Sequence, residues 1–291
     1  MYLLTQMLNG LGAGSIYALI ALGYSMVYGV VKLINFAHGD IIMVGSYIIF
    51  LTMGAGQPLW IAVLSSIAFS ALVGVVIEQV AYRRLLKSGA PRIALLITAI
   101  GASIFLQNLA QLLFGTNQRS MPKMFALPPI RFGDMNVSNT LLNILVAFAM
   151  MAFLQILVHM TKTGKAMRAT SEDPGAAQLM GININRIIIF TFAVGSALAA
   201  VGSVLYTNTY MQIKPLMGGM LGLKAFVAAV FGGIGSIPGA MLGGFLLGLA
   251  ESLSVVAGQS MWMDAAVFAI LIIILLVRPA GLLGRHMKEK V

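Results

Sequence analysis

The side chains with which this sequence could do acid–base chemistry are few and scattered. Glu78, Glu251 and Asp264 lie in or near long apolar stretches, and His38 lies two residues before Asp40. Catalysis needs two or three such groups that converge on one reacting atom. No spacing here brings together a carboxylate pair or a Ser/His/Asp set, and no series of carboxylates crosses the apolar stretches as a proton relay would. The sequence therefore predicts no catalytic residues and no enzyme.

Metal and nucleotide sites are not predicted either. His38 and Asp40 would need further ligands, which their neighbours do not supply. The chain has no Cys, which excludes thiolate metal sites and disulfides. The run from Gly232 to Gly239 lacks the Gly-Lys-Ser/Thr ending of a phosphate loop, and no strand precedes it. We expect no cofactor on this chain and a tight reversal between two helices at this run.

Two groups of polar residues interrupt the apolar sequence. Asn35-Phe-Ala-His-Gly-Asp40 separates two apolar stretches. One possibility is a broken helix at the cytoplasmic mouth of a pore, because lipid could not hydrogen-bond the free backbone N–H and C=O groups of such a break. The other is an interfacial turn capped by Asn35 or Asp40. Ser103, Gln107 and Gln111 recur at four-residue spacing. They either line a hydrated path or hydrogen-bond a neighbouring helix.

The elements that position these residues follow from composition. The chain has 59% hydrophobic and 9% charged residues, whereas a soluble domain has about 25% charged residues. A helix of about 20 apolar residues spans a bilayer. The candidate spans are residues 7–31, 34–53, 59–82, 93–114, 141–160, 187–208, 218–231, 237–257 and 262–277. The seventh is short, so we expect an all-α, polytopic transmembrane bundle of eight or nine segments, with residues 1–291 as a single permease domain.

Small residues and a possible repeat add detail to this bundle. Ala240, Gly244, Gly248 and Ser252 recur every four residues, as do Gly10, Gly14 and Ala18. Such faces let helix backbones approach closely. Residues 7–82 and residues 218–277 are each predicted to form one span, a polar or Gly-rich interruption, and then two further spans. This is either an internal repeat, as in many transporters, or two unrelated groups of helices.

The basic residues predict the orientation. The net charge of +10 comes from basic residues that lie in short loops between apolar runs. It therefore does not indicate nucleic-acid binding. One set of loops holds Lys32, Arg83, Arg84, Lys87, Arg92, Lys162, Lys165, Arg168, Arg186, Arg278, Arg285, Lys288 and Lys290, and the other holds Arg119, Lys123, Arg131, Lys214 and Lys224. Because cytoplasmic loops carry the excess, the first set and the C-terminus are expected inside, and the N-terminus and residues 119–139 outside. Met1 to Val31 lacks the basic start of a signal peptide, so we expect a retained first helix.

The cytoplasmic loop of residues 161–186 predicts a short helix. Asp173 can cap a helix that begins at Pro174, and Glu172 and Asp173 both lie at its positive end. Gly181 suits its stop. Two turns are not stable alone in water, so Ala176, Ala177, Leu179 and Met180 must pack either on this chain or in a cleft of a partner.

With this loop, several motifs resemble one family. They are Gly14-Ser-Ile-Tyr-Ala-Leu-Ile-Ala-Leu-Gly23, Ile34-Asn-Phe-Ala-His-Gly-Asp40, Arg168 to Arg186, Val230-Phe-Gly-Gly-Ile-Gly-Ser-Ile-Pro-Gly-Ala240 and Arg278-Pro-Ala-Gly-Leu-Leu-Gly284. The sequence resembles, over most of its length, the shorter permease subunit of ATP-binding-cassette importers for branched-chain amino acids (leucine, isoleucine, valine).

This resemblance implies a complex in the bacterial inner membrane. Its other members would be a second, different permease, two cytoplasmic ATPases that use ATP, and an extracytoplasmic substrate-binding protein. It also implies that the loop docks an ATPase. The residues expected at that contact are Glu172, Asp173, Ala176, Ala177 and Gly181.

The mechanism expected from the resemblance is alternating access, in which ATP binding pulls the ATPases together and they move the loop helix. We expect the substrate to pass along the interface with the partner permease. The residues expected on its path are Asn35, His38, Ser103 and Gln107. The alternatives are a stand-alone channel or secondary carrier for a small polar solute, and a membrane enzyme.

Overall fold

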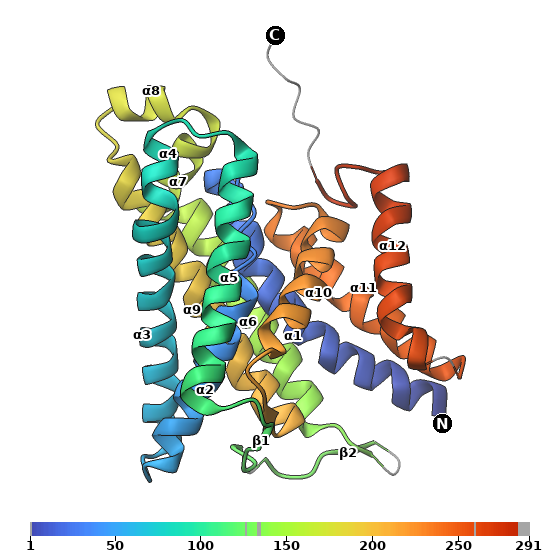
Figure 1. Cartoon of the computed structure of the whole chain (residues 1–291). Coiled ribbons are helices and arrows are strands. Elements are labelled where there is room, and N and C mark those ends of the chain that lie inside the picture. The colour runs from blue at the N-terminus through green and yellow to red at the C-terminus, as the bar shows by residue number, and fades with distance from the viewer. Residues whose placement is uncertain (1, 126, 133–134, 259, 285–291) are drawn as a thin grey trace.

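The computed structural model describes residues 2–125, 127–132, 135–258 and 260–284 as a bundle of helices (Figure 1). In these residues seven helices are long and apolar enough to cross a membrane, and two apolar helices are shorter. The long ones are α1 (Tyr2–Val31), α3 (Leu59–Ile77) with its extension, α5 (Arg92–Phe114), α6 (Ser138–Met160), α9 (Ile184–Tyr210), α11 (Ile237–Val256) and α12 (Met263–Val277) with the 3-10 turn η2 (Ser260–Trp262). The all-α bundle is therefore confirmed, and its seven long and two shorter apolar helices agree with the eight or nine segments expected.

The remaining elements are short. The two shorter apolar helices are α2 (His38–Gly54) and α10 (Met217–Gly232), and α3 continues through a π-helical turn, η1 (Glu78–Tyr82), into α4 (Arg83–Lys87). Between α6 and α9 lie α7 (Lys162–Glu172) and α8 (Pro174–Leu179). Two antiparallel pairs of two-residue strands were not predicted: β1 (Arg119–Ser120) with β4 (Gln212–Ile213), and β2 (Arg131–Phe132) with β3 (Met135–Asn136). Arg285, Lys288 and Lys290, expected inside, lie outside the described residues.

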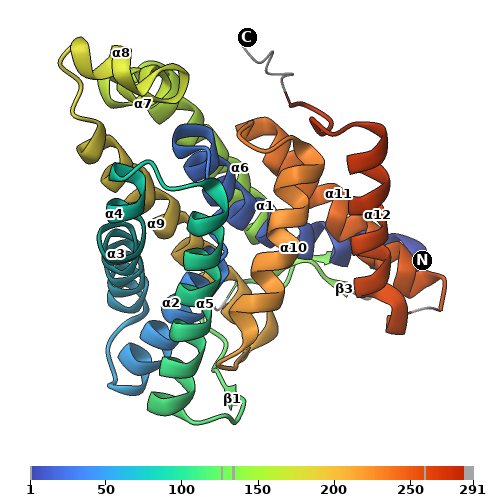
Figure 2. The same ribbon diagram turned by 45° about the horizontal axis from the view of Figure 1, so that its top comes forward.

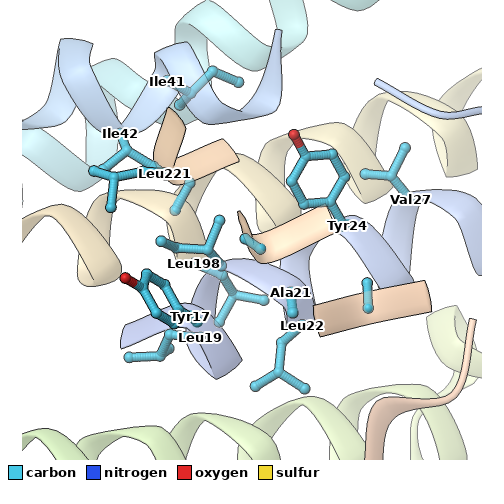
Figure 3. Close-up of a cluster of buried hydrophobic side chains, with 14 of the residues drawn as sticks. Tyr17, Leu19, Ala21, Leu22, Tyr24, Val27, Ile41, Ile42, Leu198 and Leu221 are labelled. Atoms are coloured by element: carbon cyan, nitrogen blue, oxygen red, sulfur yellow. The ribbon is translucent and has the colours of Figure 1, made fainter. Parts of the chain in front are cut away.

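Helix α1 forms the centre of the bundle. In the most apolar 18-residue stretch of α1, 83% of the residues are buried, against 6% in that of α12. Tyr17 and Tyr24 of α1 belong to a buried cluster with Leu198 of α9 and Leu221 of α10 (Figure 3). A Cβ at Gly10 would lie 2.7 Å from the carbonyl oxygen of Gly248, and one at Gly14 would lie 2.8 Å from that of Gly244. The two predicted small-residue faces thus pack against each other, which brings α1 and α11 together backbone to backbone.

The two halves of the bundle match each other in an inverted arrangement. We match α1, α2 and α3 with α9, α10 and α11, respectively. The contact of α1 with α11 then corresponds to that of α9 with α3, and the contact of α2 with α3 corresponds to that of α10 with α11. In Figure 1, α1 and α3 rise toward the end that carries α8, whereas α9 and α11 run down from it. We call that end the α8 end and the opposite one the β1 end. In these contacts the unit that matches α1–α2–α3 begins with α9, not at residue 218, where one of the two alternatives had placed it.

The break between α1 and α2 is deeper than a surface turn. Lys32 has a φ of 57°, and the chain then folds back beside α1, since a Cβ at Gly23, two turns before α1 ends, would lie 2.7 Å from Cε1 of His38. Helix α2 begins there with no side-chain cap. The capping role considered for Asn35 or Asp40 was therefore wrong. The structure shows a non-helical stretch between α1 and α2 whose end is buried in the bundle.

Candidate functional site

The short helix α8 forms as the loop sequence predicts. The side chain of Asp173 accepts a hydrogen bond of 3.0 Å from the backbone N–H of Ala176, and Pro174 occupies the first turn. After the helix, Gly181 has a φ of 83°, a left-handed conformation that costs glycine nothing. Glu172 ends α7, directly before this cap. The sequence therefore fixes both ends of α8, and α7 and α8 project together at one edge of the molecule (Figure 2).

Only one side of α8 packs against the rest of the chain. Ala177 is buried, and its carbonyl oxygen accepts a 3.0 Å hydrogen bond from the N–H of Ile182. Ala176 is exposed, and Leu179 and Met180 are 90% and 83% exposed. Helix α8 thus rests on its own chain through Ala177 and presents two large apolar side chains outward.

The break before α2 holds Asn35 and His38 inside the bundle. Both are buried, and the N–H of His38 donates to the carbonyl oxygen of Asn35 at 3.0 Å. The hydroxyl of Tyr82 donates to Oδ1 of Asn35 at 2.9 Å, and the ring of His38 meets that of Tyr24 edge-on, with 4.6 Å between centroids. These contacts join the break to η1 and α1.

Ser103 and Gln107 meet a buried carboxylate that the path prediction omitted. The hydroxyl of Ser103 donates to Oδ2 of Asp40, and Nε2 of Gln107 donates to Oδ1 of Asp40 at 3.0 Å. Asp40 is fully buried, and a Cβ at Gly218, in the first turn of α10, would lie 2.7 Å from Oδ1. Asp40 therefore also lies against the N-terminal turn of α10, whose positive end favours a negative charge. The polar stripe of α5 does bond a neighbouring helix, α2.

The sequence-predicted path residues thus fall into two groups. Ser103 and Gln107 share Asp40, whereas Asn35 and His38 lie together at the break. Asp40 was visible in the sequence, but the spacing within one helix cannot show which carboxylate faces it from another. His38 and Asp40 point to different helices, and no group of three His, Asp or Glu side chains that could hold a metal occurs in the described part of the chain.

Lys224 is a further functional candidate, and its predicted position was wrong. It was counted with the loops at the β1 end, but it is buried within α10. Its Nζ lies 2.8 Å from Oε1 of Glu251 and 2.7 Å from Oδ1 of Asp264. The hydroxyl of Tyr17 donates to Oε2 of Glu251 at 2.9 Å. The sequence does contain a sign of this cluster: one lysine and two carboxylates lie within apolar stretches, and charges buried there need partners.

Comparison with known proteins gives one consistent result. The family model described as branched-chain amino acid transport system / permease component matches residues 6–276. The high-affinity branched-chain amino acid transport system permease proteins LivH of Salmonella typhimurium and of Escherichia coli K12 are each 44% identical over 305 residues, which cover 100% of this chain and 98% of theirs. BraD of Pseudomonas aeruginosa, described in the same words, is 44% identical over 304 residues, covering 99% of this chain and 98% of its own.

The match extends across the elements described above, from α1 through α12. It includes the break at Asn35, the polar stripe of α5, helix α8 and the buried Lys224. The chain therefore belongs to the family of permease components of branched-chain amino acid transport systems.

Proposed function

We propose that this permease carries branched-chain amino acids (leucine, isoleucine, valine) inward by alternating access, as a single transmembrane domain in a bacterial inner membrane. The names of its 44% identical relatives support the solute class. Its partners would be a second, different permease, two cytoplasmic ATPases and an extracytoplasmic binding protein. ATP would be used by the ATPases, and the permease itself is not catalytic.

The observation that carries the coupling role is the exposure of Leu179 and Met180 on a helix whose other side is packed. The α8 end would face the cytoplasm, where such side chains meet water unless a partner covers them. We infer that an ATPase cleft covers them and contacts Glu172, Asp173, Ala176, Ala177 and Gly181. Because Ala177 rests on the bundle, movement of α8 would be passed to α9.

The path would run along α5. This helix packs on α2 and η1 and leaves much of its surface uncovered, which is available to a second permease. Ser103 and Gln107 would line the path and Asp40 would hold them in place. Asn35 and His38 would shape the break where α2 begins, so that α2 can shift between the inward- and outward-facing states.

The experiment compares Leu179→Ser and Met180→Ser with Met261→Ser, a matched change at the β1 end, where Met261 is 94% exposed. Loss of a well-packed apolar anchor at an interface costs about tenfold or more in affinity. We expect the two α8 variants to lose ATPase co-purification and ATP-driven leucine uptake, with unchanged membrane insertion. Unchanged uptake in both would reject the coupling role, and uptake by the permease alone without ATP would favour a carrier.

A further inference from the structure

A cavity of about 720 Å³ lies at the α8 end, on the side of α8 that faces the bundle. It is lined by the last turn of α1, by η1 and α4, by α8, and by the start of α9. Figure 1 shows α4, α8 and the start of α9 at the upper left of the bundle. Exposed residues of α8 form one wall, so the cavity opens toward the solvent at this end.

The π-helical turn decides which charged groups enter this cavity. In η1 the backbone N–H of Arg83 donates to the carbonyl oxygen of Glu78, five residues earlier. An α-helix would place residues five apart about 140° from each other around its axis, whereas the π turn places them on one face. Glu78 and Arg83 consequently both line the cavity, together with Lys87 one turn further on. Such turns are frequent at functional sites.

Among the described residues none of these three charged groups forms an ion pair. Glu78 is 1% exposed, and among the described residues its Oε2 and the Nε of Arg83 have no hydrogen-bond partner. Within that part of the chain the ion pairs are those of Lys224, so Arg83 and Lys87 attract Glu78 only from beyond the distance of an ion pair. A buried carboxylate without a partner is costly. A ligand that brings a cation to Glu78 and an anion to Arg83 would relieve both.

The rest of the lining defines the ligand further. Val30, Val31, Leu86 and Ile188 provide an apolar wall beside the charged face. A carboxylate, an ammonium and a branched apolar side chain on one small molecule describe a free α-amino acid. We propose that this cavity binds a branched-chain amino acid zwitterion, its ammonium on Glu78 and its carboxylate on Arg83 and Lys87.

Such a ligand would act on the coupling helix. Pro174, Gln178 and Gly181 line the same cavity, so a bound amino acid bridges α8 to η1 and holds α8 against the bundle. The choice of amino acid rests on the proposed function, since uptake would deliver this ligand to the side on which the cavity opens. Accumulated cytoplasmic amino acid then slows its own import.

Binding is tested first with the purified full-length chain in nanodiscs, by calorimetric titration of L-leucine. 4-Methylpentanoate lacks the ammonium and 3-methylbutylamine lacks the carboxylate; each is expected to bind about tenfold or more weakly, because each loses a charge-assisted hydrogen bond. Glu78→Gln and Arg83→Gln are expected to weaken leucine binding similarly. Arg84→Gln is the matched control, since Arg84 is exposed and does not line the cavity.

Several outcomes of the titration would overturn the proposal. They are no leucine binding to the unmodified chain, equal binding of leucine and 4-methylpentanoate, which would indicate a general anion site such as one for a lipid phosphate, and equal loss of binding in Arg84→Gln. Thermal unfolding of each variant separates lost binding from lost folding, and Lys87→Gln provides a second charge variant at the outer rim of the cavity.

Regulation is tested in proteoliposomes of the whole complex, either empty or loaded with L-leucine. Uptake into empty vesicles tests the proposed function alone. Internal leucine is expected to slow initial uptake by the unmodified complex and by Arg84→Gln, and to have little effect on Arg83→Gln or Lys87→Gln. Normal uptake that internal leucine does not slow would reject this site while leaving the import function standing.

Discussion

The ammonium of Lys224 lies 2.8 Å from a carboxylate oxygen of Glu251, and both side chains are buried in an otherwise apolar part of the bundle. Asp264 and the hydroxyl of Tyr17 complete this cluster. The four residues come from four helices, α10, α11, α12 and α1. The cluster therefore joins the peripheral α12, of which little is buried, to the central helix.

Removing the cation from this cluster should destabilise the permease strongly. Lys224→Met leaves Glu251 buried without its cation, and breaking a buried pair on one side costs about 3–5 kcal/mol. Thermal unfolding in detergent would show a lower midpoint, and the double variant Lys224→Met with Glu251→Gln should recover part of it. Lys214→Met removes an exposed lysine and should change stability little. Equal effects of the two single variants would contradict an important ion pair.

The link between α2 and α5 can be tested with two neighbouring amides. Gln107→Leu removes a donor to the buried Asp40, and leaving a buried acceptor unsatisfied costs about 1–3 kcal/mol. We expect a lower unfolding temperature and reduced leucine uptake. Asn108→Leu is the matched control, because Asn108 is exposed and donates to Ile104 of its own helix. If Asn108→Leu reduced uptake as much, the contact with Asp40 would not be the cause.

The crossing of α2 and α10 should tolerate no side chain. A Cβ at Gly222 would lie 2.7 Å from Cα of Gly39, so Gly222→Ala must push the two helices apart. Overpacking of this kind costs about 1–3 kcal/mol. Gly101→Ala in α5 has no neighbour within 4 Å and should be neutral or slightly stabilising through helix propensity. Thermal unfolding of both variants, followed by circular dichroism, measures this difference in stability. If Gly222→Ala did not lower the unfolding temperature, the two helices could separate without cost.

Local signals predicted local structure well. The cap at Asp173, the proline after it and the stop at Gly181 each depend on residues a few positions apart, so α8 could be predicted with its ends. The small-residue faces were also readable, because Gly10 and Gly14 share one side of a single helix. Periodicity within one segment is sufficient for such features.

Relationships between segments could not be read in the same way. The partners of Asp40 come from α5, more than 60 residues later, and those of Lys224 come from α11 and α12. These carboxylates stabilise the buried Lys224. Counting basic residues loop by loop takes no account of acidic partners on other helices, and so it placed Lys224 in a loop. The π-helical turn at Glu78 could not be predicted either, because the apolar pattern of α3 is the same for an α-helical and a π-helical backbone.

The orientation of the bundle is tested by single-cysteine labelling, since the chain has no Cys of its own. Leu179→Cys at the α8 end and Met261→Cys at the β1 end replace residues that are 90% and 94% exposed, so either thiol should react quickly where reagent reaches it. The excess of basic residues around α4 and α7 predicts that the α8 end is cytoplasmic. A membrane-impermeant maleimide applied to spheroplasts should therefore label Met261→Cys at once and Leu179→Cys only after lysis. Expressing the permease without its partners keeps an ATPase from masking Leu179→Cys. Labelling of Leu179→Cys in intact spheroplasts would place α8 outside, where no ATPase could reach it.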